Sequence, residues 1–379
     1  MTSNTLRIIQ VVNVRWFNAT AWYALTLSRI LREAGHSVLV LGLPGSDSFE
    51  KAEAWGLDPR PLDCNVKNPL ALAGLARRIR GVVREFRPHV VNCHRGEGFF
   101  LWAWTREAAR RYTPFALVRT RGDQRPPKTN GPNKYLHRNA DALIATNSRI
   151  AGAFKDLLGV PEGRVRTIPG GVDTGAFFPD ATGRDAVRAL WGVQPHERVF
   201  GLLGRFDPVK GQKETLEAFA ALRGLEMKDI RLVLAGFSSC TSREEVEAWV
   251  DGHGLRDSVT LTDRLPDVRA AINAFDCGLV ASTGSEAIAR AALEIMACGV
   301  PLLGTDVGVM PDLLSPEALI RAGDVSAMAA SMARFLAEDG FGAALRAEQA
   351  ERMATLDGPH FLEQTLEAYE AARWNAANR

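Results

Sequence analysis

Residues 276–305, DCGLVASTGSEAIARAALEIMACGVPLLGT, form the stretch that decides the fold. The apolar run at 275–281 has the length of a strand and leads into a small polar loop. Residues 287–298 are good helix formers, and we expect the helix to end at Gly299 because a proline follows two residues later. The run 301–304 predicts a second strand. This order of elements is one βαβ unit of a parallel sheet.

Of two acids, Glu286 directly precedes this predicted helix and Glu294 lies within it. Eight helical residues correspond to about 12 Å of rise and about 80° of rotation, so both carboxylates can face one crevice at the carboxyl edge of the sheet. Carboxylates suit a polyhydroxylated ligand because each accepts hydrogen bonds from neighbouring hydroxyls. The alternative is that Glu286 is a first-turn acid favoured by the helix dipole and that Glu294 is a solvated helix residue.

The phrase SEAIARAALEIMACGVPLLGT, residues 285–305, resembles the signature of retaining glycosyltransferases of family 4, which have the GT-B fold. The resemblance implies that Glu286 contacts the donor sugar and that Glu294 holds the nucleotide ribose. It also implies donor contacts from the intervening residues Ala287, Ile288, Ala289 and Arg290. The sequence departs from the family at Ile288-Ala289, where Phe-Gly is frequent.

A second motif, GRFDPVKG at residues 204–211, follows a predicted strand at 198–203 and precedes a predicted helix at 212–222. A strand, a loop with two cations and a helix N-terminus together suit a diphosphate. Arg205 can bind two phosphate oxygens in a fork, and Lys210 adds a compact charge. The phrase closely resembles the "GRL-x-x-x-KG" motif of family 4, which adds Gly204 to the expected donor contacts. There the two cations stabilise the leaving diphosphate.

Length and composition set the frame for these motifs. A chain of 379 residues favours two domains. A hydrophobic content of 46% and a charged content of 24% are those of a soluble globular protein. The sequence has no apolar run of membrane-spanning length and no signal-peptide layout at its start. The scattered cysteines are expected to be reduced core residues of a cytoplasmic protein; they are Cys64, Cys93, Cys240, Cys277 and Cys298.

The charges are divided unevenly along the chain. Residues 1–178 carry 26 Lys and Arg against 14 Asp and Glu, whereas the remainder carries 20 against 30. A basic half suggests an anionic partner such as phosphorylated lipid, a membrane surface or nucleic acid, the alternative being uneven solvated charge. The predicted helix at 70–86 is basic and amphipathic, so it is either a membrane-binding surface or a solvated helix face.

The chain opens with a strand at 6–12, a helix at 19–34 and a strand at 37–43, the start of a Rossmann-like sheet. It lacks G-x-G-x-x-G, which weakens a dinucleotide interpretation. The segment GHSVLV is similar to the "GHEV" segment of family 4. Asn18, Ala19 and Thr20 stand where relatives have a glycine pair, and we expect them to offer small side chains and backbone N–H groups near a phosphate.

The predicted strand at 88–94 places His94 at its carboxyl end, where ligands of parallel sheets bind. Its alternation resembles the "DVVHxH" strand of family 4, whose second histidine lies beside the sugar, so His94 rather than His89 is the catalytic candidate. Its expected role is orientation and stabilisation near the reacting carbon through a ring N–H or an imidazolium charge. A structural histidine is the alternative.

A polar loop at 121–134 with three prolines is interpreted as an acceptor-binding loop, the alternative being a flexible linker. Its candidate contacts for a phosphate or carboxylate are Arg119, Arg121, Asp123, Arg125 and Lys128. In the second half, the loop at 263–267 is similar to the one where family 4 holds the nucleotide base. Arg264 and Leu265 are the base contacts expected there.

The fold class that follows is α/β of GT-B type: two Rossmann-like domains facing a central crevice, with a C-terminal helix crossing back to the first domain. Residues 1–178, with 361–379, form the predicted acceptor-side domain, and residues 179–360 the predicted donor-binding domain. The interdomain link is expected near residues 178–184. The sequence contains neither D-x-D nor H-E-x-x-H, so no metal or other cofactor is expected.

The predicted function is a cytoplasmic, metal-independent retaining glycosyltransferase of bacterial cell-envelope polysaccharide biosynthesis. Its donor is a nucleotide diphosphate sugar, UDP-sugar by default, and its catalytic residues are His94, Arg205, Lys210 and Glu286. The expected acceptor is a lipid-linked or surface-glycan precursor such as that of lipopolysaccharide, including a phosphorylated one. Peripheral contact of the protein with the inner membrane surface is also expected. The alternatives are a sugar-nucleotide 2-epimerase of the same fold and a protein that binds anionic polymers. Nucleic acid is not an expected partner because no reader element is visible.

Overall fold

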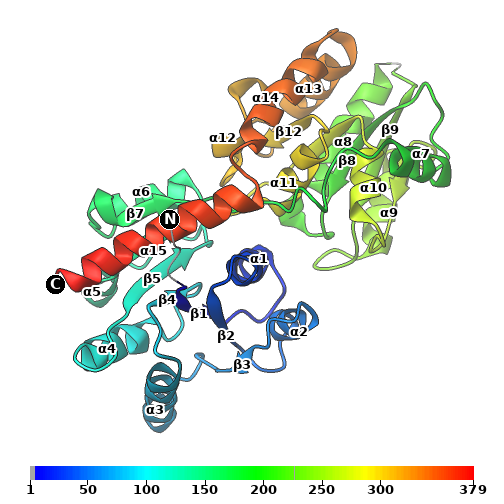
Figure 1. The fold of residues 1–379 in the computed structure, drawn as a ribbon. Coiled ribbons are helices and arrows are strands. Elements are labelled where there is room, and N and C mark those ends of the chain that lie inside the picture. The colour runs from blue at the N-terminus through cyan, green and yellow to red at the C-terminus, as the bar shows by residue number, and fades with distance from the viewer. Residues whose placement is uncertain (1–4, 226) are drawn as a thin grey trace. The chain divides into compact units, whose positions relative to one another are not determined.

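The computed structural model describes residues 5–225 and 227–379 (Figure 1). The chain forms two compact units, Met1–Gly170 with Gly358–Arg379, and Gly171–Asp357. The first boundary therefore lies before the predicted link at 178–184. That segment is bonded within the second unit, where Asn273 Nδ2 donates to the Phe178 carbonyl at 3.1 Å and Asn273 Oδ1 accepts from Asp180 N at 2.8 Å.

The first unit is built on a seven-stranded sheet in the order β3-β2-β1-β4-β5-β6-β7. All of its strand pairs are parallel, as the βαβ patterns predicted. The strands are β1 (Arg7–Val12), β2 (Ser37–Gly42), β3 (Arg60–Pro61), β4 (Val90–Cys93), β5 (Ala116–Arg121), β6 (Ala142–Ala145) and β7 (Val165–Thr167).

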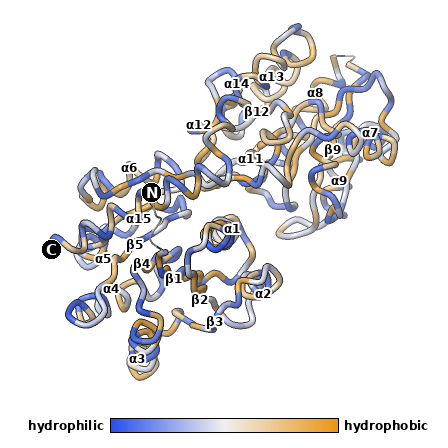
Figure 2. The backbone as a smooth tube through the Cα atoms, viewed as in Figure 1, coloured by the Kyte–Doolittle hydropathy of each residue, from blue (hydrophilic) through white to orange (hydrophobic). Residues whose placement is uncertain are grey.

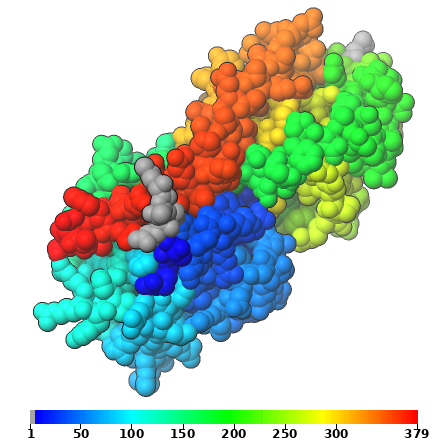
Figure 3. All heavy atoms as spheres, in the orientation of Figure 1, coloured from blue at the N-terminus to red at the C-terminus, as the bar shows by residue number. Residues whose placement is uncertain are grey.

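The helices of the first unit connect these strands, and one comes from the end of the chain. They are α1 (Ala19–Glu33), α2 (Asp47–Ala54), α3 (Pro69–Phe86), α4 (Phe99–Ala109), α5 (Gly131–Arg138), α6 (Ser148–Asp156) and α15 (Gly358–Ala377). Helix α15 packs against β5 and β6, and Figure 3 shows its red carboxyl end against cyan residues of the same unit. The predicted return of the last helix to the first domain is thus confirmed.

The second unit contains a six-stranded parallel sheet in the order β10-β9-β8-β11-β12-β13. Its strands are β8 (Arg198–Leu203), β9 (Ile230–Ala235), β10 (Val259–Leu261), β11 (Cys277–Val280), β12 (Leu302–Thr305) and β13 (Leu319–Ile320). Its helices are α7 (Ala181–Leu190), α8 (Gln212–Gly224), α9 (Arg243–Gly252), α10 (Val268–Asn273), α11 (Arg290–Ala297), α12 (Met310–Leu313), α13 (Val325–Ala337) and α14 (Phe341–Met353). Each of the two units is therefore built on one Rossmann-like parallel sheet.

Burial and capping explain why these segments fold as they do. The strands are apolar along nearly their whole length because helices cover both faces of a parallel sheet, and β1 and β2 are coloured as hydrophobic in Figure 2. Polar side chains cap the helices: Asn18, Asn68 and Asn147 accept hydrogen bonds from backbone N–H groups in the first turns of α1, α3 and α6. Each such cap satisfies an N–H group that has no partner inside its helix.

The predicted helix at 287–298 begins later than its composition indicates. Helix α11 spans Arg290–Ala297, and Ala289 before it has a left-handed backbone with φ of 50°. The preceding loop is tied down instead: Glu286 O accepts a hydrogen bond from Val309 N at 2.8 Å, and Ile288 is buried. Glu286 is therefore a loop residue, and the helical rise and rotation assumed between it and Glu294 were wrong. Tertiary contacts outweigh the helix propensity of the alanines here.

One glycine allows α8 to approach β11 closely. Gly211 has φ of 74°, and a Cβ atom at this position would overlap the carbonyl group of Ala281, just beyond the strand. Only glycine offers both the left-handed backbone and the empty space. The N-terminus of α8 therefore lies directly against the carboxyl end of β11, which places the GRFDPVKG loop beside the loop that contains Glu286.

In the described residues, none of the helices has the length and apolar character required to cross a membrane.

Replacing Gly211 by alanine is expected to destabilise the second unit. The left-handed backbone alone costs an L-residue about 1–2 kcal/mol, and the overlap with Ala281 adds to this because backbone atoms cannot move aside cheaply. Urea unfolding followed by tryptophan fluorescence measures the effect. The matched control is Gly224→Ala at the end of the same helix, where a Cβ meets nothing within 4 Å. Equal unfolding midpoints for the two variants would contradict the close approach.

Candidate functional site

The side chains of Lys210 and Glu286 form an ion pair across two loops of the second unit, although they lie 76 residues apart in sequence. Lys210 ends the short turn before α8, and Glu286 follows β11. The same Glu286 oxygen, Oε1, also accepts a hydrogen bond from Ser282. Glu286 is 8% exposed, and Oε2 takes part in neither bond. Oε1 is thus held in place by the side chains of Lys210 and Ser282.

The backbone around this pair is fixed by several hydrogen bonds. Thr283 N donates to the Val209 carbonyl at 2.9 Å, which joins the two loops directly. Thr305 at the end of β12 donates through Oγ1 to the Ser282 carbonyl at 2.6 Å. These hydrogen bonds join the two loops to each other and to the end of β12. We call Arg205, Asp207, Lys210, Ser282 and Glu286 the donor cluster.

Arg205 belongs to the same loop as Lys210 but has a different partner. Its Nε and Nη2 atoms donate to Asp207 Oδ2 at 3.0 and 2.7 Å, and its carbonyl accepts a hydrogen bond from Gln212 Nε2 at 2.8 Å. The Arg205 side chain is 43% exposed and that of Asp207 is 11% exposed. Asp207 therefore orients a guanidinium group whose remaining N–H groups are available to an anion.

The remaining predicted donor contacts lie on both sides of this cluster. Glu294 is buried in α11 and accepts a hydrogen bond from Arg290 Nε at 2.6 Å. Burial raises the pKa of the Glu294 carboxyl, an effect that the charge of Arg290 opposes. Arg264 lies over the ring of Phe237 at 3.9 Å, next to Leu265 in the predicted base-binding loop. Three further candidates lie in the loops around the cluster and would contact a ligand through their backbone groups; they are Gly204, Ala287 and Ala289.

In the first unit, a cavity of about 380 Å³ lies where β4 and β5 end. We call it the strand-end cavity; it is lined by Thr20, His94, Arg95, Gly96, Glu97, Arg119, Arg121, Gly122, Asp123, Arg125 and Lys128. The structure thus brings His94 together with all five of the acceptor residues predicted from sequence. The lining carries five cationic side chains and two acids, so it favours an anionic ligand.

The acceptor candidates differ in how freely they can bind a ligand. Arg119 is buried and donates to the Cys93 carbonyl at 2.9 Å, so its side chain is held in the wall of the cavity. Asp123 pairs with the exposed Arg125 at 2.6 Å, and Arg121 Nε donates to the Asp123 carbonyl at 3.0 Å. In the described part of the chain, Lys128 makes no side-chain hydrogen bond or ion pair.

His94 is fully enclosed, and its ring is oriented by a buried network of polar side chains. Its Nε2 atom lies 2.7 Å from Gln10 Oε1. Gln10 Nε2 donates to the Tyr369 hydroxyl at 3.0 Å, and Asn92 Nδ2 donates to the same oxygen at 3.0 Å. Asn92 Oδ1 in turn accepts from Thr120 at 2.9 Å. With Gln10 Nε2 donating to Tyr369, Gln10 Oε1 faces His94 Nε2 and favours a proton on that nitrogen, while Asn92 Nδ2 lies 3.3 Å from the same atom.

This assignment leaves Nδ1 of His94 as an acceptor, and Nδ1 is one of the buried atoms without a hydrogen-bond partner in the described structure. Burial, together with the charge of Arg119, lowers the pKa of His94 to about 3. The ring is therefore neutral at physiological pH, and its only N–H group is bonded to Gln10. Of the two predicted roles, the imidazolium charge is disfavoured by this low pKa, and the role through a ring N–H stays a prediction. The ring can also accept a hydrogen bond from a hydroxyl group.

Asn18 and Ala19 lie at the start of α1. Asn18 Oδ1 accepts a hydrogen bond from Ala21 N at 3.1 Å, so the side chain caps the helix. Neither residue lines the strand-end cavity, whereas the next residue, Thr20, does and donates through Oγ1 to the Gly122 carbonyl at 3.3 Å. The proximity of Asn18 and Ala19 to a phosphate remains a prediction.

Several participants were missed by the sequence analysis. Ser282 and Asp207, which orient the donor cluster, stand next to the quoted motifs and carry no signal of their own. Gln10 and Asn92 did carry one, because each is a polar residue inside an otherwise apolar strand and such a residue needs a buried partner. That partner, Tyr369, is 277 residues from Asn92 and could not be identified from spacing.

Two family profiles match consecutive parts of the chain. Residues 20–176 match the profile described as Glycosyltransferase Family 4, and residues 184–354 match the one described as Glycosyl transferases group 1. Together they include nearly all of the elements described above.

Curated relatives match parts of the chain. It is 31% identical over 231 residues to the lipopolysaccharide core biosynthesis mannosyltransferase LpsB of Rhizobium meliloti, covering 58% of this chain and 62% of that protein. It is 29% identical over 243 residues to the D-inositol 3-phosphate glycosyltransferase of Mycolicibacterium smegmatis, covering 62% of this chain and 53% of that protein. The chain spans about half the length of the curated relatives it matches.

Solved structures match over the whole fold. HepE of Anabaena in complex with UDP superposes with a TM-score of 0.83 at 18% identity, covering 97% of this chain and 100% of HepE. The same protein has been solved with UDP and glucose, with a TM-score of 0.80. The two parallel sheets, the consecutive profile matches and the motif-bearing loops at the strand ends agree with one another, and the chain belongs to the family 4, or group 1, glycosyltransferases with the GT-B fold.

Proposed function

We propose that this chain is a metal-independent retaining glycosyltransferase that moves a sugar from a nucleotide diphosphate donor, UDP-sugar by default, to an acceptor bearing an anionic group. The observation that carries the proposal is the Lys210–Glu286 ion pair beside the N-terminus of α8. It combines a cation for phosphate oxygens with a carboxylate for sugar hydroxyls in one rigid cluster. The HepE structures with UDP and with UDP and glucose support this choice of donor by analogy.

In the proposed reaction the bond between the anomeric carbon and the diphosphate oxygen breaks, and negative charge builds on the departing diphosphate. Arg205 and Lys210 donate to its oxygens, and the positive end of the α8 dipole adds to the stabilisation. The two cations and the helix dipole supply the positive charge that a metal ion supplies in other enzymes, so we propose that no metal ion takes part in the reaction. Asp207 and Glu286 orient the two side chains, so little reorganisation is needed as the charge develops.

Retention is proposed from the family 4 signature at residues 285–305. The acceptor hydroxyl forms its bond to the anomeric carbon on the face that the diphosphate vacates, and its proton passes to an oxygen of that diphosphate. Glu286 Oε2 is suited to accept a hydrogen bond from a donor-sugar hydroxyl. Neutral His94 is suited to accept another through Nδ1. In both cases the oriented acceptor atom selects a hydroxyl rather than an anion.

The strand-end cavity supports an acceptor that carries phosphate or carboxylate. Arg121, Arg125 and Lys128 lie around its rim, and Arg119 adds charge from beneath. One relative is named for D-inositol 3-phosphate and another for lipopolysaccharide core synthesis, which accord with a phosphorylated or cell-envelope acceptor.

We also propose peripheral contact with the inner face of a bacterial membrane from the cytoplasmic side. The exposed face of α3 carries Arg77, Arg78 and Arg84, and Leu70 at its start is 84% exposed. Arg80 lies over the ring of the half-exposed Trp104 at 5.2 Å. A basic helix with exposed apolar groups suits an anionic lipid surface. Failure to sediment with phosphatidylglycerol vesicles at low salt would refute this contact.

Glu286→Gln, Lys210→Ala and Arg205→Ala are each expected to lower the rate of sugar transfer by orders of magnitude, because each removes a charge from the donor cluster. Lys213→Ala is the matched control, since Lys213 is an exposed cation on the first turn of α8. The measurement is release of UDP with candidate acceptors, with and without EDTA, and we expect EDTA to leave the wild-type rate unchanged. Wild-type rates in all three variants would refute the site. Epimerised sugar nucleotide without acceptor or UDP release would favour a 2-epimerase.

His94→Ala is expected to lower kcat by about 2- to 10-fold, the value of one hydrogen bond between neutral groups of about 0.5–1.5 kcal/mol. Because the pKa of the ring is about 3, protonation disables it only as the pH falls towards that value. Activity should therefore show no histidine titration between about pH 5 and pH 8, the range of an ordinary histidine. Nitrogen-15 NMR of the ring should show the proton on Nε2, and Tyr369→Phe should perturb this resonance while preserving side-chain volume. A proton found on Nδ1 would rule out the proposed role.

Removing the phosphate groups of an acceptor should raise its KM, and Arg121→Gln/Arg125→Gln should raise KM for the phosphorylated acceptor alone. Each lost charge-assisted hydrogen bond is worth about 1.5–3 kcal/mol before solvent screening. The comparison of the two acceptors with the two enzymes separates recognition of the anion from damage to the fold. If the variant and the dephosphorylated acceptor leave KM unchanged, the anionic acceptor is excluded.

A further inference from the structure

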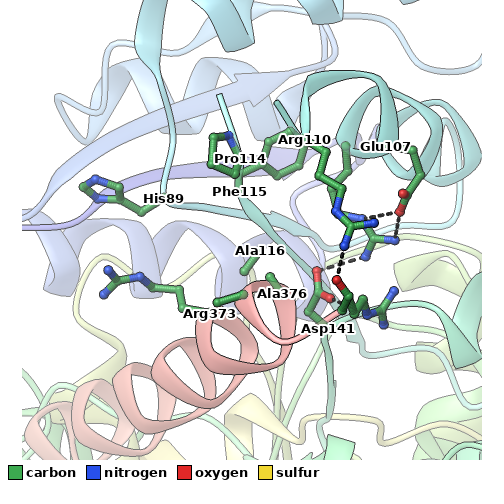
Figure 4. Close-up of a pocket in the computed structure, with 12 residues that line it drawn as sticks. His89, Glu107, Arg110, Pro114, Phe115, Ala116, Asp141, Arg373 and Ala376 are labelled. Atoms are coloured by element: carbon green, nitrogen blue, oxygen red, sulfur yellow. Dashed lines mark hydrogen bonds and ion pairs between the residues drawn. The ribbon is translucent and has the colours of Figure 1, made fainter. Parts of the chain in front are cut away.

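A second hollow in the first unit lies at the opposite edge of its sheet. It has a volume of about 360 Å³ and adjoins the residues that precede β4, β5 and β6. We call it the amino-edge pocket; it is lined by His89, Arg106, Glu107, Arg110, Pro114, Phe115, Ala116, Asp141, Arg373, Ala376, Ala377 and Arg379. Figure 4 shows the Arg373 side chain of α15 extending towards the side of His89, with Arg110 and Glu107 on the other side of Ala376. None of these residues belongs to the donor cluster or to the strand-end cavity.

The acids of the amino-edge pocket are already neutralised. Asp141 is inaccessible to solvent, and its Oδ2 accepts hydrogen bonds from Arg106 Nη1 at 2.9 Å and Leu117 N at 2.7 Å. Its Oδ1 pairs with Arg379 Nε at 3.2 Å. Glu107 pairs with Arg106. Arg106 and Arg379 therefore balance the two carboxylates and fix the inner part of the pocket.

Two further arginines have no Asp or Glu partner among the described residues. Arg110 donates to the main-chain oxygen of Arg379. Arg373, on α15, makes no hydrogen bond or ion pair among residues 5–225 and 227–379. Both side chains are exposed at the mouth of the hollow, so their positive charges are not balanced by its Asp and Glu side chains.

His89 adds a donor to this pair of charges. Its Nδ1 accepts a hydrogen bond from Arg7 N at 3.0 Å, so a neutral ring carries its proton on Nε2. Burial, followed by the charges of Arg7 and Arg373, lowers the pKa of His89. An anion near Arg373 would be met by its guanidinium group and by the imidazole N–H of His89.

The rest of the lining is apolar. Phe115 and Ala116 are buried where β5 begins, and Pro114 and Ala376 lie beside them. A volume of about 360 Å³ is at the lower end of the range for small-molecule sites. The combination suits a compound with a charged head and a small uncharged body.

We propose that the amino-edge pocket binds a small phosphate or carboxylate compound, with Arg373 and His89 contacting the anion and Arg110 adding positive charge from the other side of the pocket. Such a ligand would join α15 to the residue before β4, because Arg373 and His89 come from these two places. It would therefore stabilise the first unit, and the gain would increase with ligand concentration. Its binding does not involve the residues proposed for sugar transfer, so it holds or fails independently of the proposed function.

The test compares Arg110→Gln/Arg373→Gln with Arg111→Gln, a matched control in which the neighbouring exposed arginine lies outside the pocket. Equilibrium dialysis with glycerol 3-phosphate counts the ions bound per chain. UDP is present throughout, and every protein also carries Arg121→Gln/Arg125→Gln, which weakens anion binding in the strand-end cavity. We expect the double variant to lose one bound ion, or to bind it at least about tenfold more weakly, since one charge-assisted hydrogen bond is worth about that much. The control should bind as the Arg121→Gln/Arg125→Gln background does.

Two further arms identify the source of the anion. Benzoate replaces glycerol 3-phosphate to test a carboxylate, and vesicles of phosphatidylcholine with or without phosphatidate test a lipid headgroup. Selective loss of binding in the double variant with the soluble compounds supports a soluble ligand, and selective loss with phosphatidate vesicles supports a headgroup. Equal binding by the double variant and the Arg111→Gln control in all arms overturns the proposal. Circular dichroism and UDP binding confirm that the double variant is folded.

Discussion

The ion pair between Lys210 and Glu286 is the interaction on which the second unit's candidate site depends. Each group is costly to hold away from water unless it is paired, and here the cost is offset by the partner charge and by Ser282. The pair requires α8 to lie against the end of β11, which the left-handed backbone at Gly211 permits. A single close approach therefore determines which loop residues can act together on a nucleotide sugar.

The first unit solves a similar problem with neutral groups. Gln10 and Asn92 place amides within a buried parallel sheet, where an unpaired polar group is expensive. Tyr369 on α15 accepts from both, and the chain of bonds then orients Gln10 and favours one tautomer of His94. Helix α15, which returns from the end of the chain, therefore orients the ring of His94, the residue that directly follows β4. Low dielectric strengthens each bond of such a network and makes each missing bond costly.

The carboxyl and amino edges of the first unit's sheet differ in how their charged side chains are paired. At the carboxyl edge, the cations of the strand-end cavity surround a neutral histidine and are distributed along a polar loop. At the amino edge, two arginines are used to balance buried acids and two are left over. Only the first arrangement follows the general rule that parallel sheets bind ligands beyond the carboxyl ends of their strands. The second exists because α15 brings cations to an edge that would otherwise be closed by connecting loops.

The sequence by itself indicated the βαβ pattern of both halves, because apolar runs of strand length and helical segments are local signals. It also predicted the main site residues, since Arg205, Lys210, Glu286 and His94 belong to motifs or to strand ends. Only the tertiary structure decided that Glu286 lies in a loop before α11 and not in the helix, because the bond from Val309 and the burial of Ile288 outweigh local helix propensity. It also decided the protonation of His94 and the existence of the amino-edge pocket. Both depend on α15, whose contacts join residues hundreds of positions apart, and no local pattern encodes such a separation.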